Sequence, residues 1–357
     1  MRKLLLASLF MLSSAAYAAF TYPLLVIDTM DTATLPAEFR TLNQPLPANN
    51  TFNSQGLASM QVAGSAQFSE KQLTAVTNKL HPVSLMIFDL RQEDHGFLNG
   101  NAISWYGINN QANLGKTGQQ IEQDQFQRLN VLQNLPSTTL YQIASKGSDG
   151  SITSARPYTM TVNNVFAESD LTRAYSFGYT RIYVTDHMRP TDSQVDRFLT
   201  AYQALPASTW IYVHCRGGKG RTTTFLAMID MLRNGKNVSF DDIIKRQTAL
   251  GSTDLSKPFP ATDINAQAAL DRYQFLQDFY TYSTKAPAKM LWSAWLNQQK
   301  MNAMSKSIIK VNPSTTPVPS SNPPAVVAPV TSAPTTSTSS AASTGTTAAT
   351  NNQVVTP

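Results

Sequence analysis

The stretch "WIYVHCRGGKGRTTTF", Trp210 to Phe225, places a run of β-branched and aromatic residues directly before a glycine-rich basic loop. A short apolar run of this kind predicts a buried strand. After the loop, apolar residues recur at helical spacing until Gly235, which is typical of a helix end. The stretch therefore predicts a strand, a loop and a helix in succession.

The same alternation occurs elsewhere in the chain. Apolar runs at residues 84–90 and 181–186 predict further buried strands, and helical patterns occupy residues 118–135 and 191–205. Strands that alternate with helices indicate an α/β fold, and the ligand sites of such folds lie at the C-terminal ends of the strands. We therefore expect a site where the runs 181–186 and 210–215 end.

The loop from Cys215 to Arg221, here called the phosphate loop, has the composition of an anion site. Gly217, Gly218 and Gly220 let the backbone curl so that successive N–H groups point inward, next to a helix N-terminus. Arg221 can add a bidentate fork to a bound phosphate. The pattern predicts that this loop binds phosphate.

Cys215 is the only cysteine of the chain and lies at the start of this loop. A small core residue is one interpretation, because free cysteines are often buried. The positive field of the loop instead favours a thiolate nucleophile. In that case Thr222 can donate a hydrogen bond to the sulfur, and His214 holds the loop through its ring nitrogens.

The first residues, "MRKLLLASLFMLSSAAYAAF", have a basic start, a short apolar run and small residues up to Ala18. This pattern predicts a signal peptide over residues 1–18. The apolar run is too short to span a bilayer, so we expect no stable membrane insertion. The protein is predicted to be exported, either to the periplasm or out of the cell.

The last residues, 307–357, consist almost wholly of Ser, Thr, Pro, Ala, Val and Asn. Such a composition buries too little apolar surface to fold and predicts a disordered tail. One domain of residues 19–306 remains. The formal net charge of +6 falls once the signal peptide and the basic residues near the tail are set aside, which argues against a nucleic-acid partner.

Residues His214 to Thr222 complete the pattern H-C-x5-R-T, which resembles the cysteine-dependent phosphatases of the protein tyrosine phosphatase superfamily. The resemblance implies a phosphocysteine mechanism without a metal or another cofactor. Such a mechanism needs a general acid, because an alkoxide leaving group must be protonated. Asp186, at the end of a predicted strand, is the candidate, although a loop or helix-capping aspartate is the alternative.

The segment "TDHMRPT" around Asp186 resembles the acid loop of the protein-tyrosine-phosphatase-like phytases. Residues 89–107, 113–117 and 291–296 and the segment "LPAEFR" resemble further parts of that family. The resemblance implies that Asp186 is the acid and that His187, Arg40 and His95 contact the substrate. For Arg40 and His95, a structural salt bridge or a loop hydrogen bond is an equal alternative. It also implies a core sheet flanked by helices and a smaller, partly barrel-like β element.

The phosphate loop departs from many of these phytases, whose loop is closer to H-C-E-A-G-V-G-R-T. Arg216 and Lys219 add positive charge and resemble the loop of phosphoinositide 3-phosphatases. They suit a small substrate with several phosphates, unless they are solvated charges at the rim. The segment after Pro260 also lacks the lysines expected of a phytase.

The favoured hypothesis is a phosphatase that hydrolyses the phosphate monoesters of inositol polyphosphates such as phytate. A phosphoinositide lipid phosphatase is the alternative, followed by a protein tyrosine or dual-specificity phosphatase. The least favoured hypothesis is a protein that binds polyanions without catalysing a reaction.

Overall fold

The computed structural model describes residues 20–311 of the chain. One compact unit extends to Ser305, and a second begins at Lys306. The predicted signal peptide and nearly all of the predicted tail lie outside the described residues. The predicted domain limits therefore stay predictions.

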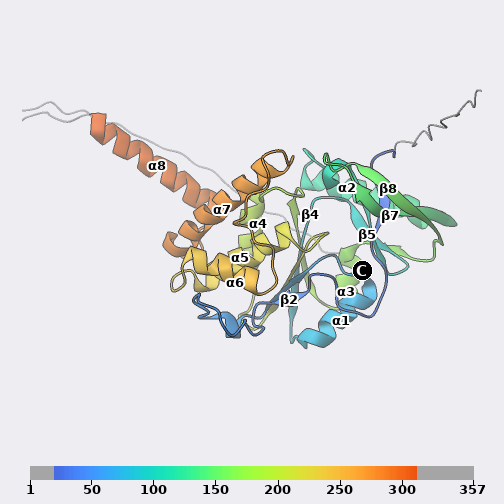
Figure 1. Cartoon of the computed structure of the whole chain (residues 1–357), viewed down its shortest axis with the longest axis horizontal. Coiled ribbons are helices and arrows are strands. Elements are labelled where there is room, and N and C mark those ends of the chain that lie inside the picture. Colours follow the sequence, from blue (N-terminus) through green and yellow to red (C-terminus); the bar gives the residue numbers. More distant parts are fainter. Residues whose placement is uncertain (1–19, 312–357) are drawn as a thin grey trace, which may run out of the picture. The chain divides into compact units, whose positions relative to one another are not determined.

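The core of the fold is a five-stranded sheet in the order β10-β4-β11-β3-β2, here called the core sheet (Figure 1). Four of its strands run parallel, and the short edge strand β2 runs antiparallel to β3. The bounds are β2 (Arg40–Thr41), β3 (Val62–Ser65), β4 (Leu85–Arg91), β10 (Gly178–Val184) and β11 (Trp210–His214). The strands predicted at residues 84–90, 181–186 and 210–215 are confirmed.

Helices cover both faces of the core sheet, so its strands are apolar on both sides. Met86, Phe88 and Leu90 of β4 pack toward one face, and Leu85 and Ile87 pack toward the other. The first face carries α4 (Asp192–Gln203), α5 (Gly220–Asn234), α6 (Phe240–Ala249), α7 (Ala266–Lys285) and the start of α8 (Trp292–Val311). The second face carries α1 (Glu70–Leu80) and α3 (Glu168–Ala174), as Figure 1 shows.

A second sheet of six strands, in the order β8-β7-β1-β6-β5-β9, lies beside the core sheet. Its bounds are β1 (Leu24–Thr29), β5 (His95–Leu98), β6 (Asn101–Tyr106), β7 (Ser137–Lys146), β8 (Ile152–Thr161) and β9 (Val165–Phe166). This is the smaller β element that the family resemblance implied. It is an open sheet, because its outer strands β8 and β9 do not pair with each other. The element is therefore not a closed barrel.

Helix α2 (Gly118–Gln133) packs on the second sheet through Leu129 and Leu132. It begins where the sequence predicted, because the Thr117 side chain caps it and the Thr117 backbone N–H donates to Gln120 Oε1. Short 3-10 helices occupy Leu57–Ser59 and Ile108–Asn110. In the described part of the chain, every helix is too short or too polar to cross a bilayer.

A buried ion pair joins α5, the helix that follows the phosphate loop, to α6. Arg246 Nε donates to Asp230 Oδ2 over 2.7 Å, and a second hydrogen bond joins Arg246 Nη2 to Asp230 Oδ1. Both side chains are completely buried. The pair fixes the direction of α5 and with it the loop at the N-terminus of that helix.

We predict that Asp230→Ala lowers the free energy of unfolding by about 3–5 kcal/mol, because it leaves the Arg246 guanidinium buried without a counter-charge. Urea unfolding measures the change. Arg173→Ala is the control, since it removes an exposed ion pair with Asp170 and is expected to cost less than about 1 kcal/mol. Equal losses in the two variants would contradict the prediction.

Candidate active site

The phosphate loop connects β11 to α5 at the C-terminal end of β11, as predicted. Gly218 has a φ of 68°, and a Cβ at this position would lie 2.4 Å from the Ala66 backbone nitrogen. Both observations explain why a glycine stands there. The curl leaves Cys215 buried at the base of the loop, with 3% of its surface exposed.

Thr222 and His214 occupy the positions around Cys215 that their predicted roles require. Thr222 Oγ1 lies 3.2 Å from Cys215 Sγ, close enough to donate a hydrogen bond to a thiolate. His214 Nε2 lies 2.6 Å from Glu168 Oε1, and both side chains are buried. Glu168 of α3 thus holds the histidine that directly precedes the cysteine.

Arg221 is held by a carboxylate that the sequence analysis did not identify. Its Nη1 and Nη2 atoms lie 2.7 and 3.0 Å from the two carboxylate oxygens of Glu93, and Nη2 lies 3.2 Å from Asp186 Oδ1. Against the effect of burial, Asp186 and Glu93 raise the pKa of Arg221 well above its ordinary value. The Arg221 Nε donor has no partner among the described residues, which leaves it available to a phosphate oxygen.

Asp186 lies opposite the phosphate loop, where a general acid is required. Asn110 donates to its Oδ2 over 2.8 Å, and Arg221 pairs with its Oδ1. Burial raises the pKa of Asp186, but Arg221, His187 and the hydrogen bond from Asn110 together outweigh burial, so the net shift of the pKa is downward. A phosphate bound between the two would add negative charge next to the carboxyl group and so favour the protonated acid.

His187 follows Asp186 with a φ of 68° and is held from α7. Arg272 Nη1 donates to the His187 carbonyl oxygen over 3.1 Å. Burial lowers the pKa of His187, which favours the neutral ring. His187 is thereby placed beside the acid at the mouth of the site.

Arg272 is a second cation that the sequence analysis missed. It is buried, and its Nη1 lies 2.8 Å from the point where a Cβ on Gly220 would stand. No carboxylate of the described residues forms an ion pair with it, and its Nε has no hydrogen-bond partner there. It lies in the segment after Pro260, which lacks the lysines expected of a phytase. In this chain α7 supplies Arg272 to the loop as a cation from that segment.

The two extra cations of the loop occupy different environments. Arg216 Nε lies 2.6 Å from Asp28 Oδ1 of β1, so this side chain ties the loop to the second sheet. The Lys219 side chain is 66% exposed, and its Nζ lies 3.6 Å from Glu38 Oε1. Arg216 thus belongs to the wall of the site, and Lys219 belongs to its rim.

Arg40 has the contacts of the structural alternative that the sequence left open. It is only 3% exposed, and its guanidinium is used within the protein. Its nitrogens donate to the Ser252 hydroxyl, the Gly218 carbonyl oxygen and the Thr223 hydroxyl. Through these bonds Arg40 braces the phosphate loop from behind, and its contact with a substrate stays a prediction.

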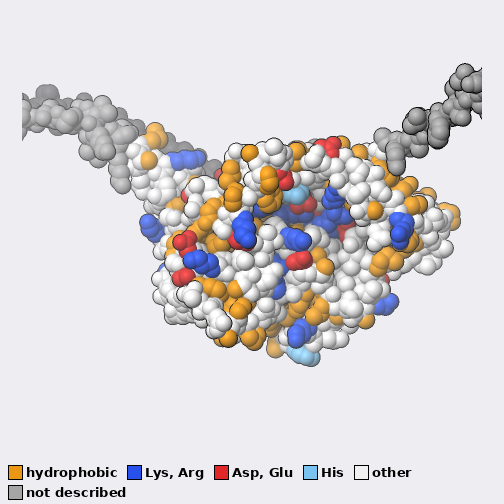
Figure 2. All heavy atoms as spheres, viewed as in Figure 1, with side chains coloured by type: hydrophobic (Ala, Val, Ile, Leu, Met, Phe, Trp, Pro, Cys, Tyr) orange, Lys and Arg blue, Asp and Glu red, His pale blue; other side chains and the backbone are white. Residues whose placement is uncertain are grey.

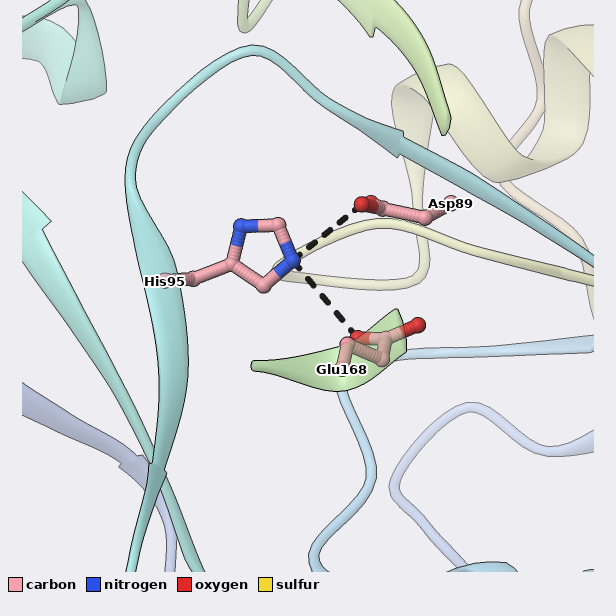
Figure 3. Close-up of side chains that lie close together, drawn as sticks. All are labelled: Asp89, His95 and Glu168. Carbon is pink, nitrogen blue, oxygen red and sulfur yellow. Dashed lines mark ion pairs between the residues drawn. The ribbon is translucent and has the colours of Figure 1, made fainter. Parts of the chain in front are cut away.

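His95 has the salt bridges of the structural alternative, because it is 1% exposed and lies within an ion cluster (Figure 3). Its Nε2 lies 3.1 Å from Asp89 Oδ2 and 3.6 Å from Glu168 Oε2, and its Nδ1 donates to the Glu93 carbonyl oxygen. Against the effect of burial, Asp89 raises the pKa of His95 to about 9. The charged ring therefore links β4, α3 and the turn that carries Glu93.

Comparison with known proteins places this geometry in a family. The model of the protein-tyrosine-phosphatase-like phytase family matches residues 88–233, and the description of that family reads "Inositol hexakisphosphate". The structure of such a phytase from Bdellovibrio bacteriovorus is 33% identical, with a TM-score of 0.61, over 78% of this chain and 96% of that chain. This chain belongs to the protein-tyrosine-phosphatase-like phytase family. The recognition and the fold class predicted from the sequence are confirmed.

Two longer relatives are also similar to this member of the phytase family. A Mitsuokella multacida myo-inositol phosphatase, solved with myo-inositol-(1,3,4,5)-tetrakisphosphate, is 31% identical with a TM-score of 0.69, over 78% of this chain and 50% of that chain. The effector protein hopD2 of Pseudomonas syringae pv. tomato is 29% identical over 72% of this chain and 56% of its own length. This chain thus spans about half the length of each.

We predict that the His95 ion cluster makes stability depend on pH. Because the folded pKa of about 9 exceeds the ordinary value near 6.5, this stabilisation is complete below about pH 6.5 and is lost as the pH rises through about 9. Urea unfolding of the wild type across this range should show a falling free energy of unfolding. In His95→Gln the decline should be smaller, and an equal decline would contradict the prediction.

Proposed function

We propose that this chain is a cysteine-dependent phosphatase that hydrolyses the phosphate monoesters of inositol polyphosphates. The observation that carries the proposal is the excess of positive charge around the phosphate loop. Figure 2 shows Lys and Arg side chains gathered in a hollow on the face in view. The cations in contact with the loop or its partners are Arg40, Arg91, Arg216, Lys219, Arg221 and Arg272.

Fewer carboxylates than cations lie there, and each of them is already paired. They are Asp28, Glu38, Glu93 and Asp186. A phosphate in the loop is held by Arg221 and the loop N–H groups, so Arg272, whose Nε has no partner among the described residues, and the exposed Lys219 remain for further anions. Several phosphates on one small ring would bring such anions, and this supports an inositol polyphosphate.

In the first step, the Cys215 thiolate attacks the phosphorus atom, so an S–P bond forms as the P–O bond to the inositol breaks. The Nε donor of Arg221 and the backbone N–H groups of the loop hold the phosphate oxygens and stabilise the charge in the transition state. Asp186 donates its proton to the leaving alkoxide. His187, beside the acid, is placed to contact the substrate.

In the second step, a water molecule attacks the phosphocysteine. Asp186, now a carboxylate, accepts the proton of the water as the S–P bond breaks. The departing sulfur regains its negative charge, and the Thr222 hydroxyl at 3.2 Å stabilises it. Inorganic phosphate leaves, and the enzyme returns to its first state.

The relatives and the loop sequence support this choice over its alternatives. The Mitsuokella relative was solved with an inositol tetrakisphosphate, which carries several phosphates on one ring. The exposed Lys219 at the rim keeps a phosphoinositide headgroup as the second candidate, because it adds a cation where a larger substrate would enter. We also propose that the protein is exported, which the pattern of residues 1–18 supports.

The test measures phosphate release from inositol hexakisphosphate, a short-chain phosphoinositide and a phosphotyrosine peptide, with a chelator present. We expect the hexakisphosphate to be the best substrate, with activity retained in chelator and lost in Cys215→Ser. Asp186→Asn should lower kcat for it by about 10²–10⁴-fold. The same variant should lower kcat far less for p-nitrophenyl phosphate, whose phenolate leaves without a proton.

The control is Asp278→Asn, which removes a carboxylate of α7. Its kcat for the hexakisphosphate should match that of the wild type. Preference for the phosphopeptide, or loss of activity in chelator, would contradict the proposal. Preference for the phosphoinositide would favour the second candidate.

A further inference from the structure

Asn110, the last residue of the 3-10 helix Ile108–Asn110, is a buried amide whose role the mechanism does not explain. It is 2% exposed. Its Nδ2 donates to Asp186 Oδ2 over 2.8 Å and to Glu93 Oε1 over 2.9 Å, so both hydrogens of the amide group are used. One side chain thus joins the general acid to the carboxylate that holds Arg221.

The position of Asn110 requires a donor. Both neighbours are carboxylates, which only accept hydrogen bonds when they are ionised, so the amide nitrogen fits between them. The Oδ1 acceptor of Asn110 is buried and has no hydrogen-bond partner among the described residues. A buried acceptor without a partner costs stability. This cost indicates that the amide serves the acid and not the stability of its own loop.

The backbone that carries the amide is strained and firmly anchored. Asn109 and Asn110 have φ values of 52° and 59°, in the left-handed region that residues other than glycine seldom adopt. The Asn109 backbone N–H donates to the Gly150 carbonyl oxygen over 3.2 Å, and Asn109 Nδ2 donates to Asn265 Oδ1 over 2.8 Å. These bonds fix the loop to the β7–β8 turn and to the start of α7. They keep the Asn110 side chain directed at Asp186.

We propose that Asn110 is a positioning residue, which holds the Asp186 carboxyl group in place and stabilises its ionised form. Before a substrate binds, Asn110 Nδ2 and Arg221 Nη2 each approach one oxygen of Asp186, and both contacts favour the carboxylate. A phosphate bound to Arg221 offsets the charge of that arginine, and Asn110 then keeps the carboxyl group oriented while it is protonated. The inference rests on the proposed function and adds a residue that controls the protonation of the acid.

Asn110 acts on Asp186 together with the charged groups that face it. Burial raises the pKa of Asp186, Arg221 lowers it, and Glu93 raises it. Four further groups interact with it electrostatically from the acid loop, α7, β7 and β6, namely His187, Arg272, Lys146 and Tyr106. The hydrogen bond from Asn110 lowers the pKa of Asp186. Loss of this hydrogen bond should therefore raise the pKa of the acid.

The test follows kcat/KM for inositol hexakisphosphate against pH in Asn110→Gly, because glycine accepts the left-handed backbone. Division by the wild-type value at each pH removes the titration of the substrate. Asp186 must be protonated to act as the acid, and a higher pKa keeps it protonated to a higher pH. The ratio should therefore rise about tenfold with pH and level off about two pH units above the ordinary pKa of 3.8.

A second variant and a matched control accompany this measurement. Asn110→Asp tolerates the same backbone but replaces the donor with a carboxylate, so its ratio should rise in the same direction. The control is Gln111→Ala, because Gln111 Nε2 donates to the Asp186 backbone carbonyl oxygen over 3.1 Å. Its ratio to the wild type should not change with pH. A ratio that is independent of pH in both Asn110 variants would overturn the inference.

A titration without turnover separates this inference from the proposed function. In the Cys215→Ser background, carbon NMR spectroscopy follows the Asp186 carboxyl group against pH, and the signal is assigned by its loss in Asp186→Asn. Asn110→Gly should raise the pKa of Asp186 by about one unit. If the wild type does not hydrolyse the hexakisphosphate but this shift is observed, the proposed function fails and the inference stands. An unchanged pKa of Asp186 would overturn the inference whether or not the compound is hydrolysed.

Discussion

The buried ion pair between Arg221 and Glu93 is the interaction on which the site depends. Glu93 accepts hydrogen bonds from Arg221 through both carboxylate oxygens, and Arg91 and Asn110 donate to the same group. Its position leaves the Nε of Arg221 to the phosphate and one Nη to Asp186. One carboxylate therefore fixes the positions of the phosphate loop and Asp186 relative to each other before any substrate binds.

The site lies where the core sheet and the second sheet meet, and buried charges join the two. Asp28 of the second sheet binds Arg216 of the phosphate loop. Glu168 of α3 binds His214, which directly precedes the phosphate loop, and it also approaches His95 of the second sheet. Buried charges are costly unless they are paired, so these contacts disfavour any arrangement that separates the sheets. The geometry needed for phosphate binding is thus part of the core itself.

The sequence predicted the parts of the site that follow from local pattern. The strand, the curl and the helix around Cys215 arise from apolar periodicity and glycine spacing, and Asp186 stands at a strand end. Glu93, Arg272 and Asp28 were missed, because only tertiary packing brings them to the loop. Of these residues, Glu93 was the one that the sequence could have indicated. It follows the buried strand β4, whose C-terminal end lies on the same side of the core sheet as that of β11. For Arg40 and His95 the sequence left a substrate contact and a structural role open, because a sequence does not distinguish a buried brace from a ligand contact.

The central claim is that Cys215 forms a covalent phosphoenzyme, and rapid-quench trapping tests it most directly. The wild type is mixed with inositol hexakisphosphate, quenched in denaturant within the first turnover, digested and examined by mass spectrometry. Our account predicts a phosphate group on the peptide that carries Cys215, formed and lost at rates that match turnover. Turnover without phosphate on that peptide, or with phosphate on another residue, would contradict the account.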